Sequence, residues 1–370
     1  TRCGGASIST DMITYTVAAA LMGLHHAPHR REARLLDPQI HEDRRRCGVT
    51  DDGRHVILGA GPLGVSLQAH LRNEGVEVDL WSIMGDRAYD MPGSEPEPVD
   101  GADTAAVAGV CAGASVIYLL LNAHYVDWYP LFPARLVAAI GAASTVGAPL
   151  VYHDSVYVYG PADEVLTEES DLAATTRKGR LRAEMAATFM TAVREERIEG
   201  AIGRSADMYG PGALNSAFGS TFGQRHFYPL MDGKTVNVIG DPDVPHAYAF
   251  VDDVARGLAV LGREPEAIGR VWHLPAVPAR SHRELLDVAG TSVGVQAKVR
   301  GSRITSLVVR FLGRFQADTS EVAEMLYLFE QPLRVSHQRF EDAFGAHPTS
   351  HADALARTLA WYREHPQYRI

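Results

Sequence analysis

The feature that most constrains the fold is the glycine loop at residues 59–64, GAGPLG, which has the form G-x-G-x-x-G. An apolar run at residues 55–58 precedes the loop, and a helical pattern that carries Leu67 and Leu71 one turn apart follows it. A second strand-like run covers residues 76–82. A strand, a glycine turn, a helix and a second strand in this order predict the start of a doubly wound α/β sheet.

The alternation of apolar runs and helical patterns continues beyond this unit. Residues 116–121 and 148–151 are continuous apolar runs, which are typical of strands buried on both faces of a parallel sheet. Helical patterns cover residues 129–143 and 176–197. We therefore predict an α/β fold with a Rossmann-type doubly wound parallel sheet.

The chain divides into three predicted parts. Residues 1–53 show no clear period and are expected to form a poorly ordered extension. Residues 54–235 are expected to form the Rossmann-type domain. Residues 236–370, where the pattern becomes irregular, are expected to form mostly a smaller substrate-binding lid domain, interleaved with the first. We place it over the carboxyl ends of the strands, where α/β proteins bind their ligands.

Composition excludes several classes of function. The formal net charge of −10 disfavours nucleic acid and acidic membrane surfaces as partners. The apolar stretch at residues 12–24 is shorter than the roughly 20 residues of a membrane span, so we expect no membrane partner. The three cysteines form no close pair, which argues against a zinc ribbon and a disulfide framework and favours a reducing, cytoplasmic location. No metal site is predicted.

The glycine loop itself predicts a dinucleotide site. The first glycine permits the tight turn, the second lets the backbone approach a pyrophosphate, and the third allows close packing of helix and strand. The expected cofactor is NAD or NADP. An acidic residue usually holds the ribose at the end of the second strand, but Ser82 stands there, so the choice between the two cofactors stays open.

Several later segments add a family resemblance. They are VIYLLLNA, PLVYHDSVYVYGP, IGRSADMYGPG, GDPDVPHAYAFVDDVARGL and RVWHLPA, in this order. Together with the glycine loop they resemble the extended short-chain dehydrogenase/reductases, the group of NAD(P)-dependent nucleotide-sugar epimerases and dehydratases. The resemblance extends from about residue 54 to the end of the chain.

The resemblance implies a set of cofactor-binding residues, with Asp100 toward the adenine and Leu121 and Asn122 beside the nicotinamide ribose. It also places Ser155, four residues before Tyr159, where the family keeps its catalytic serine or threonine. The full set expected to bind the cofactor is Gly59, Gly61, Pro62, Leu63, Gly64, Ser82, Asp100, Leu121, Asn122 and Arg180.

The family's Tyr-x-x-x-Lys motif is absent, since no tyrosine of this chain has a lysine four residues later. Counting back from Glu184 puts Arg180 in the position of the lysine and Thr176 in that of the tyrosine. Arginine can hold the nicotinamide ribose as a fixed cation, but a threonine hydroxyl is far too weak an acid to carry the proton near neutral pH.

Another residue must therefore carry the proton if the chain is an enzyme. Tyr159 and His246 are our principal candidates, and Lys178 lies close to the vacated position. Tyr157 and Tyr159 are expected on the same strand face as Ser155. The expected substrate-binding residues are Arg204, Tyr209 and Tyr157.

Two kinds of function follow from these residues. The first is an NAD(P)-binding oxidoreductase or epimerase that acts on a nucleotide sugar or another small polar metabolite. The alternative is a dinucleotide sensor or scaffold that has lost catalysis, which the missing motif and the missing ribose acid both favour. A third possibility is an isomerase or cyclase that uses the pocket without redox chemistry. A homodimer and a monomer are both compatible with the helical patterns.

Overall fold

The computed structural model describes residues 53–83, 96–121, 127–214, 222–302, 311, 320, 323–345 and 347–369. Asn122 and the predicted extension before residue 53 lie outside the described residues. Arg54–Ile370 form one compact unit of the chain.

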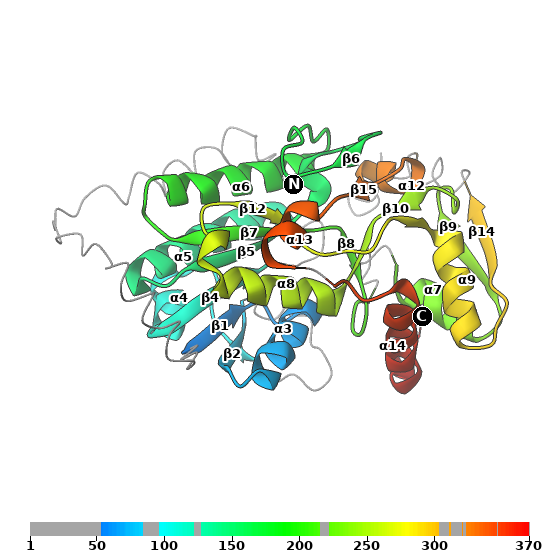
Figure 1. Cartoon of the computed structure of the whole chain (residues 1–370), viewed down its shortest axis with the longest axis horizontal. Helices are drawn as coiled ribbons and strands as arrows, with labels where there is room; N and C mark the ends of the chain where they lie inside the picture. The colour runs from blue at the N-terminus through cyan, green and yellow to red at the C-terminus, as the bar shows by residue number, and fades with distance from the viewer. Residues whose placement is uncertain are drawn as a thin grey trace, which may run out of the picture. The chain divides into compact units, whose positions relative to one another are not determined.

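A seven-stranded sheet forms the centre of this unit, with the strand order β12-β7-β5-β4-β1-β2-β3 (Figure 1). Every pairing in the sheet is parallel. The chain runs outward from β1 to β3 and then returns through β4 to β12, which confirms the predicted doubly wound α/β fold. The strands are β1 Arg54–Leu58, β2 Glu77–Ser82, β3 Glu97–Pro98, β4 Ala114–Leu120, β5 Leu150–Ser155, β7 Gly200–Ser205 and β12 Val271–His273.

Helices cover both faces of the sheet. On β7, Gly200 faces Phe189 of α6 and Gly203 faces Leu258 of α8, and residues three apart on a strand point to opposite faces. Helix α3 packs beside α8, while α4, α5 and α6 are neighbours in the other layer. The helices are α3 Pro62–Asn73, α4 Thr104–Val110, α5 Trp128–Val146, α6 Arg177–Arg194 and α8 Val251–Arg263.

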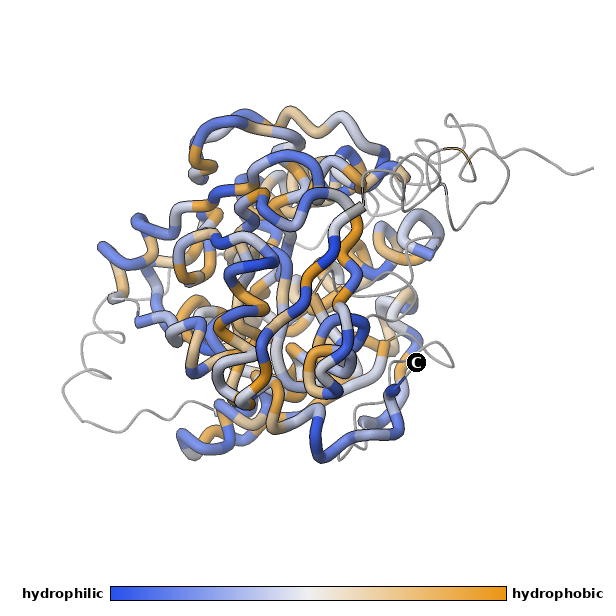
Figure 2. Tube along the Cα trace, turned by 90° about the vertical axis from the view of Figure 1, so that its right-hand side faces the viewer, coloured by the Kyte–Doolittle hydropathy of each residue, from blue (hydrophilic) through white to orange (hydrophobic). Residues whose placement is uncertain are grey.

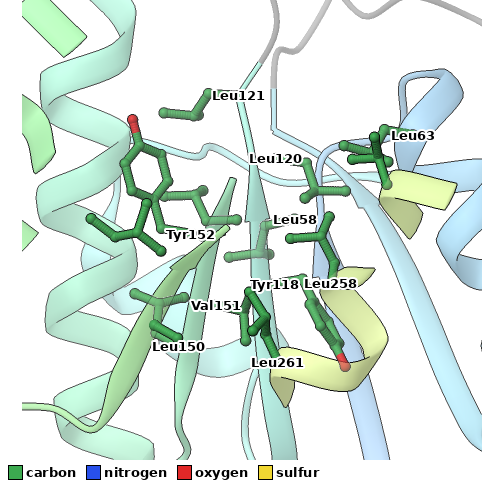
Figure 3. Close-up of a cluster of buried hydrophobic side chains, with 14 of the residues drawn as sticks. Leu58, Leu63, Tyr118, Leu120, Leu121, Leu150, Val151, Tyr152, Leu258 and Leu261 are labelled. Atoms are coloured by element: carbon green, nitrogen blue, oxygen red, sulfur yellow. The ribbon is translucent and has the colours of Figure 1, made fainter. Parts of the chain in front are cut away.

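The sheet and its helices share one hydrophobic core. Side chains from β1, β4, β5 and α8, among them Leu58, Leu120, Val151 and Leu258, gather between the strands and the helices (Figure 3). Hydrophobic and hydrophilic positions alternate along the helices, as expected where one helix face is buried (Figure 2). This core fixes the carboxyl ends of the strands, where the predicted site residues lie.

A second hydrophobic core gathers residues from the later part of the chain. Strands β9 and β14 pair in parallel, and α14 contacts α7 and α9. Helix α9 begins with the capping box of Ser281 and Glu284. The elements are α7 Gln224–Met231, β9 Thr235–Ile239, α9 His282–Ser292, β14 Lys298–Ser302 and α14 His351–Glu364.

The remaining short elements connect these cores. Strand β8 pairs in parallel with β11, β10 pairs antiparallel with β13, and β6 pairs in parallel with β15. They are η3 Val156–Val158, β6 Val165–Leu166, β8 Asp207–Tyr209, β10 Pro245–His246, β11 Tyr248–Phe250, η4 Pro265–Ala267, β13 Arg280–Ser281, α12 Tyr327–Glu330, β15 Arg334–Val335, α13 Gln338–Phe344 and η5 Pro366–Tyr368. The residues of α8 and β12 belong to the first core, and those of α7 belong to the second. The exact domain boundary remains a prediction.

Candidate active site at the carboxyl edge of the sheet

The glycine loop joins β1 to α3, and backbone sterics explain two of its glycines. Gly59 has φ +135°, and a Cβ there would lie 2.2 Å from the carbonyl oxygen of Leu120. A Cβ on Gly64 would lie 1.9 Å from the carbonyl oxygen of Gly59. Only glycine fits at either position, because no side chain tolerates such approaches.

Gly61 differs, since a Cβ there would meet no described atom within 4 Å. It is the N-cap of α3 with an extended backbone and no capping side chain, and Pro62 occupies the first helical position. The backbone N–H groups of Leu63 and Gly64 in this first turn therefore have no partner within the helix. Open space in front of uncapped N–H groups at a helix N-terminus fits a pyrophosphate.

Among the other residues predicted to bind the cofactor, Ser82 and Leu121 are buried, whereas Asp100 is exposed. Ser82 is buried where β2 ends, and Leu121 is buried directly after β4. Asp100 is exposed, and its Oδ1 accepts a hydrogen bond from the N–H of Ala102 at 3.0 Å, so it forms a local turn. Ser82 and Leu121 thus lie at the carboxyl edge of the sheet, as the glycine loop does.

Ser155 is the last residue of β5. Its hydroxyl oxygen accepts a hydrogen bond from the N–H of Tyr157 at 3.3 Å and so caps the 3₁₀ turn η3. The hydroxyl proton of Ser155 is not used in that bond, so it can be donated to a substrate oxygen. Because residues 156–158 form a turn, the expectation that Tyr157 and Tyr159 continue a strand face from Ser155 is wrong.

Tyr159 lies in a buried hydrogen-bond network. Its hydroxyl accepts from Arg204 Nη1 at 2.7 Å and lies 2.6 Å from Nε2 of His273. The other ring nitrogen of His273 lies 2.8 Å from the carbonyl oxygen of Ser336, which can only accept, so Nδ1 carries the proton and Nε2 accepts from Tyr159. Burial raises the pKa of Tyr159 and lowers that of His273 to about 4. The phenol is therefore fully engaged and a poor proton donor.

Arg204 is held by the same network. It is buried, and its Nε donates to Asp154 Oδ2 at 3.0 Å. Asp154 is buried too, and its Oδ1 lies 3.9 Å from Arg182 Nη1. Because its guanidinium donates hydrogen bonds to both Asp154 and Tyr159, Arg204 connects the carboxyl ends of β5 and β7 inside the protein.

Tyr157 and His246 meet at one carboxylate. The hydroxyl of Tyr157 donates to Asp207 Oδ1 at 2.5 Å, and Nε2 of His246 lies 2.9 Å from Asp207 Oδ2. The Nδ1 of His246 donates to the carbonyl oxygen of Leu328 at 2.9 Å. Both ring nitrogens of His246 are thus engaged with oxygen acceptors, and the residue is buried.

Tyr209 belongs to the second core rather than to this network. Its ring packs against Phe222, Tyr248 and Phe250, and its hydroxyl lies 3.3 Å from Nδ1 of His351. Burial raises the pKa of Tyr209. Its predicted contact with substrate remains a prediction, as does that of Tyr157.

Thr176 and Arg180 have local partners. Thr176 is the N-cap of α6, and its hydroxyl accepts from the N–H of Gly179 at 3.0 Å. Arg180 is exposed, and its Nη1 donates to the carbonyl oxygen of Thr175 at 2.6 Å. Thr176 is therefore buried as the cap of α6, whereas Arg180 lies on the exposed face of the helix.

The buried face of α6 carries two charged residues four positions apart, Lys178 and Arg182. Arg182 Nη1 donates to the hydroxyl of Tyr152 at 3.2 Å, and Nη2 lies 3.5 Å from the carbonyl oxygen of Leu121. The count back from Glu184 takes the register of Thr176 and Arg180 instead, and that assignment stays a prediction. Lys178 and Arg182 each lie three residues before an apolar position of the buried face, Leu181 and Met185.

Two classes of feature are absent from the part of the chain that the structure describes. No cluster of three or more His, Cys, Asp or Glu side chains there has a geometry that could hold a metal ion. Among the same residues, no helix combines the length and the apolar character that crossing a membrane requires.

Comparison with known proteins identifies the family. Residues 56–274 match the NAD dependent epimerase/dehydratase family. This match covers more than half of the chain, so the chain belongs to that family of NAD-dependent enzymes, as the resemblance implied. No curated protein matches the chain.

Solved structures share the fold at low sequence identity. A double mutant of dTDP-glucose 4,6-dehydratase from Streptomyces venezuelae with NAD bound is 20% identical, with a TM-score of 0.68 over 85% of this chain and 98% of that one. UDP-N-acetylglucosamine 4-epimerase from Bacillus cereus is 11% identical, with a TM-score of 0.65 over 84% and 96%. A dTDP-glucose 4,6-dehydratase from Bacillus anthracis in complex with NAD is 14% identical, with a TM-score of 0.67 over 85% and 98%.

Proposed function

We propose that this protein is an NAD(P)-dependent enzyme that transfers hydride to or from a nucleotide sugar or another small polar metabolite. The observation that carries the proposal is the glycine loop. Gly59 and Gly64 are required by the backbone, whereas Gly61 leaves open space in front of the N-terminus of α3. A purely structural turn does not need the second glycine, but a bound pyrophosphate does.

The residues of the chain have distinct roles in this proposal. The N–H groups of Leu63 and Gly64 bind the pyrophosphate, and Ser155 orients the oxygen of the substrate with its hydroxyl proton. When bound, the nicotinamide supplies a carbon that accepts or returns hydride. Ser82 offers one hydroxyl at the end of β2, which suits either ribose form, so both NAD and NADP are proposed as cofactors.

The substrate class rests on the relatives. The solved structures with this fold include a dTDP-glucose 4,6-dehydratase and a UDP-N-acetylglucosamine 4-epimerase. A sugar nucleotide is therefore the first substrate class to test, with dTDP-glucose and UDP-glucose as probes.

Replacing Gly61 tests the cofactor site. Gly61→Asp places a carboxylate in the open space, where it repels a pyrophosphate, so saturable binding of NADH and NADPH is expected to be lost. Gly109→Asp, at an exposed position of α4 with equally open surroundings, is the matched control and should bind as the wild type does. Nicotinamide fluorescence and thermal stability measure binding, since a ligand at 100 times its Kd adds about 2.7 kcal/mol. An unchanged Kd in Gly61→Asp would refute the proposal.

A second function, a dinucleotide sensor without catalysis, is favoured by one specific observation. No tyrosine of the chain is followed by a lysine four residues later, and the phenol of Tyr159 is engaged inside the protein. Saturable cofactor binding without any change in nicotinamide absorbance across a panel of sugar nucleotides and carbonyl compounds would support the sensor.

A further inference from the structure

Ser155 belongs to a segment that otherwise lies inside the protein. Of residues 150–160, all of which the structure describes, Ser155 alone is partly exposed, and the residues on both sides of it are buried. The turn η3 follows the serine directly, and Gly160, with φ +72°, comes after the turn. The direction of the Ser155 hydroxyl therefore depends on how its buried neighbours are held.

Arg204 contacts this segment on both sides of Ser155. Its Nε donates to Oδ2 of Asp154, the residue directly before the serine, at 3.0 Å. Its Nη1 donates to the hydroxyl of Tyr159, the residue that caps the end of η3, at 2.7 Å. A guanidinium is planar and presents its N–H groups in fixed directions, so one side chain sets the separation between the two ends of the segment.

The position of Arg204 is itself fixed by the sheet. The residue lies on β7 between β5 and β12, where Asp154 and His273 are its partners in register. Its carbonyl oxygen accepts from the N–H of Leu274 at 2.9 Å. The side chains of Arg204 and Asp154 are 2% and 0% exposed, so solvent ions screen their attraction little. The guanidinium is therefore a fixed point at the carboxyl edge of the sheet.

Tyr159, the second acceptor of Arg204, is held as well. Its hydroxyl donates to Nε2 of His273 at 2.6 Å, and the two rings meet edge to face with their centroids 5.4 Å apart. Nδ1 of His273 donates to the carbonyl oxygen of Ser336 at 2.8 Å, and its backbone N–H donates to Oε1 of Glu168 at 2.8 Å. The phenol thus has a fixed place from which it accepts the guanidinium.

Other contacts hold the middle of the turn. The hydroxyl of Tyr157 donates to Oδ1 of Asp207 at 2.5 Å. The carbonyl oxygen of Tyr157 lies against α6, where a Cβ on Gly179 would approach it to 2.4 Å. Neither contact involves the first or the last residue of the segment. Among the hydrogen bonds of the described residues, those of Arg204 join its two ends.

We infer that Arg204 and Tyr159 are positioning residues for Ser155, an inference that rests on the function proposed for that serine. Arg204 keeps both ends of the segment in place, so the Ser155 hydroxyl keeps its direction while it donates its proton to the substrate oxygen. Tyr159 acts as the acceptor that fixes the guanidinium and takes part in the reaction through the serine. A displacement of about 1 Å in such a group slows a reaction by about a hundredfold.

Tyr159→Phe tests the inference in the protein without ligands. It removes the acceptor of Arg204 and keeps the ring, so the turn should open more often. The amide hydrogens of residues 157 and 159, which donate to Ser155 Oγ and to the carbonyl oxygen of Val156, are expected to exchange about tenfold faster. Mass spectrometry of peptides that cover residues 154–160 measures this exchange.

Tyr118→Phe is the matched control. The hydroxyl of Tyr118 is also buried and also lies beside a histidine ring nitrogen, 3.3 Å from Nδ1 of His55, but on β4. Its loss should leave the exchange of residues 154–160 at the wild-type rate.

Arg204→Lys gives a second test. It keeps a positive charge beside Asp154, but an ammonium group cannot present the fork of donors that holds Asp154 and Tyr159 together. The same two amides should therefore exchange faster. Wild-type exchange at residues 154–160 in both Tyr159→Phe and Arg204→Lys would overturn the inference. Equal acceleration along every strand of the sheet would overturn it too, because the two residues would then support the fold as a whole.

Kinetics separate a positioning residue from one that reacts itself. With a sugar nucleotide that the wild type turns over, Tyr159→Phe is expected to lower kcat by about tenfold to a hundredfold and to leave KM and the Kd for the cofactor unchanged. Added to Ser155→Ala, Tyr159→Phe should lower kcat no further, because it acts through the serine. A further loss of the same size in the double variant would overturn the inference. If no cofactor binds the wild type, the proposed function fails, whereas the exchange measurement still decides whether Arg204 holds the turn.

Discussion

The glycine loop and the first turns of α6 lie at the same edge of the sheet but are determined in different ways. The loop is fixed by backbone sterics, since Gly59 and Gly64 leave no space for a Cβ. The start of α6 is fixed by side-chain burial, which turns Lys178 and Arg182 inward and Arg180 outward. The first region is therefore determined by its backbone and the second by the packing of its side chains. A substitution in the loop must therefore fit the backbone around it, whereas one at the start of α6 must fit the side chains around it.

The charged network under the strand ends offers the strongest test of this contrast. Asp154→Ala would leave Arg204 and Arg182 as buried charges without their carboxylate. We expect a loss of about 3–5 kcal/mol in the free energy of unfolding, measured by urea denaturation at pH 7. Asp171→Ala, at an exposed position before α6, should cost less than about 0.5 kcal/mol. A loss below about 1 kcal/mol in Asp154→Ala would mean that the network does not support the site.

Replacing two glycines of the loop by alanine is expected to change the unfolding free energy by different amounts, the larger of which is intermediate among these predictions. Gly64→Ala forces a Cβ toward the carbonyl oxygen of Gly59, and we expect a loss of about 1–3 kcal/mol of unfolding free energy. Gly61→Ala meets no described atom and should cost less than about 1 kcal/mol. Equal losses in the two variants, again measured by urea denaturation, would contradict the view that backbone packing fixes the loop.

Acid sensitivity gives the smallest effect when the change in unfolding free energy is counted per pH unit. Burial, first among its causes, lowers the pKa of His273 from 6.5 to about 4, so the folded protein resists a proton that the unfolded chain accepts. Stability is therefore fully present above pH 6.5 and is lost as the pH falls toward 4, by at most about 1.4 kcal/mol per pH unit for one histidine.

His273→Gln should reduce that slope, measured as unfolding free energies across the same pH range. Burial also lowers the pKa of His153 to about 3 and that of His226 to about 4, so part of the slope remains in the variant. The exposed His347→Gln is the control. If the unfolding free energy of His273→Gln falls with pH as steeply as that of the wild type, protonation of His273 does not contribute to the acid sensitivity.

The sequence predicted the fold and the glycine loop because both depend on local signals. Apolar runs bounded by glycine identify the strands. The spacing of the three glycines is typical of a tight turn between a strand and a helix. The site was harder to predict. Thr176 and Arg180 are predicted from their spacing to Glu184, but the sequence did not indicate that Arg180 would be exposed while Lys178 and Arg182 are buried. The network of Asp154, Tyr159 and His273 joins residues far apart in the chain, so no local pattern indicates it.

The contact of Gly179 with the Tyr157 carbonyl oxygen constrains how this site can diversify. Any larger residue at position 179 would lift the helix away from the serine that precedes η3, so the platform must stay as it is. The side chains at positions 178 and 182, on either side of that contact, can therefore vary only on a backbone that stays in place.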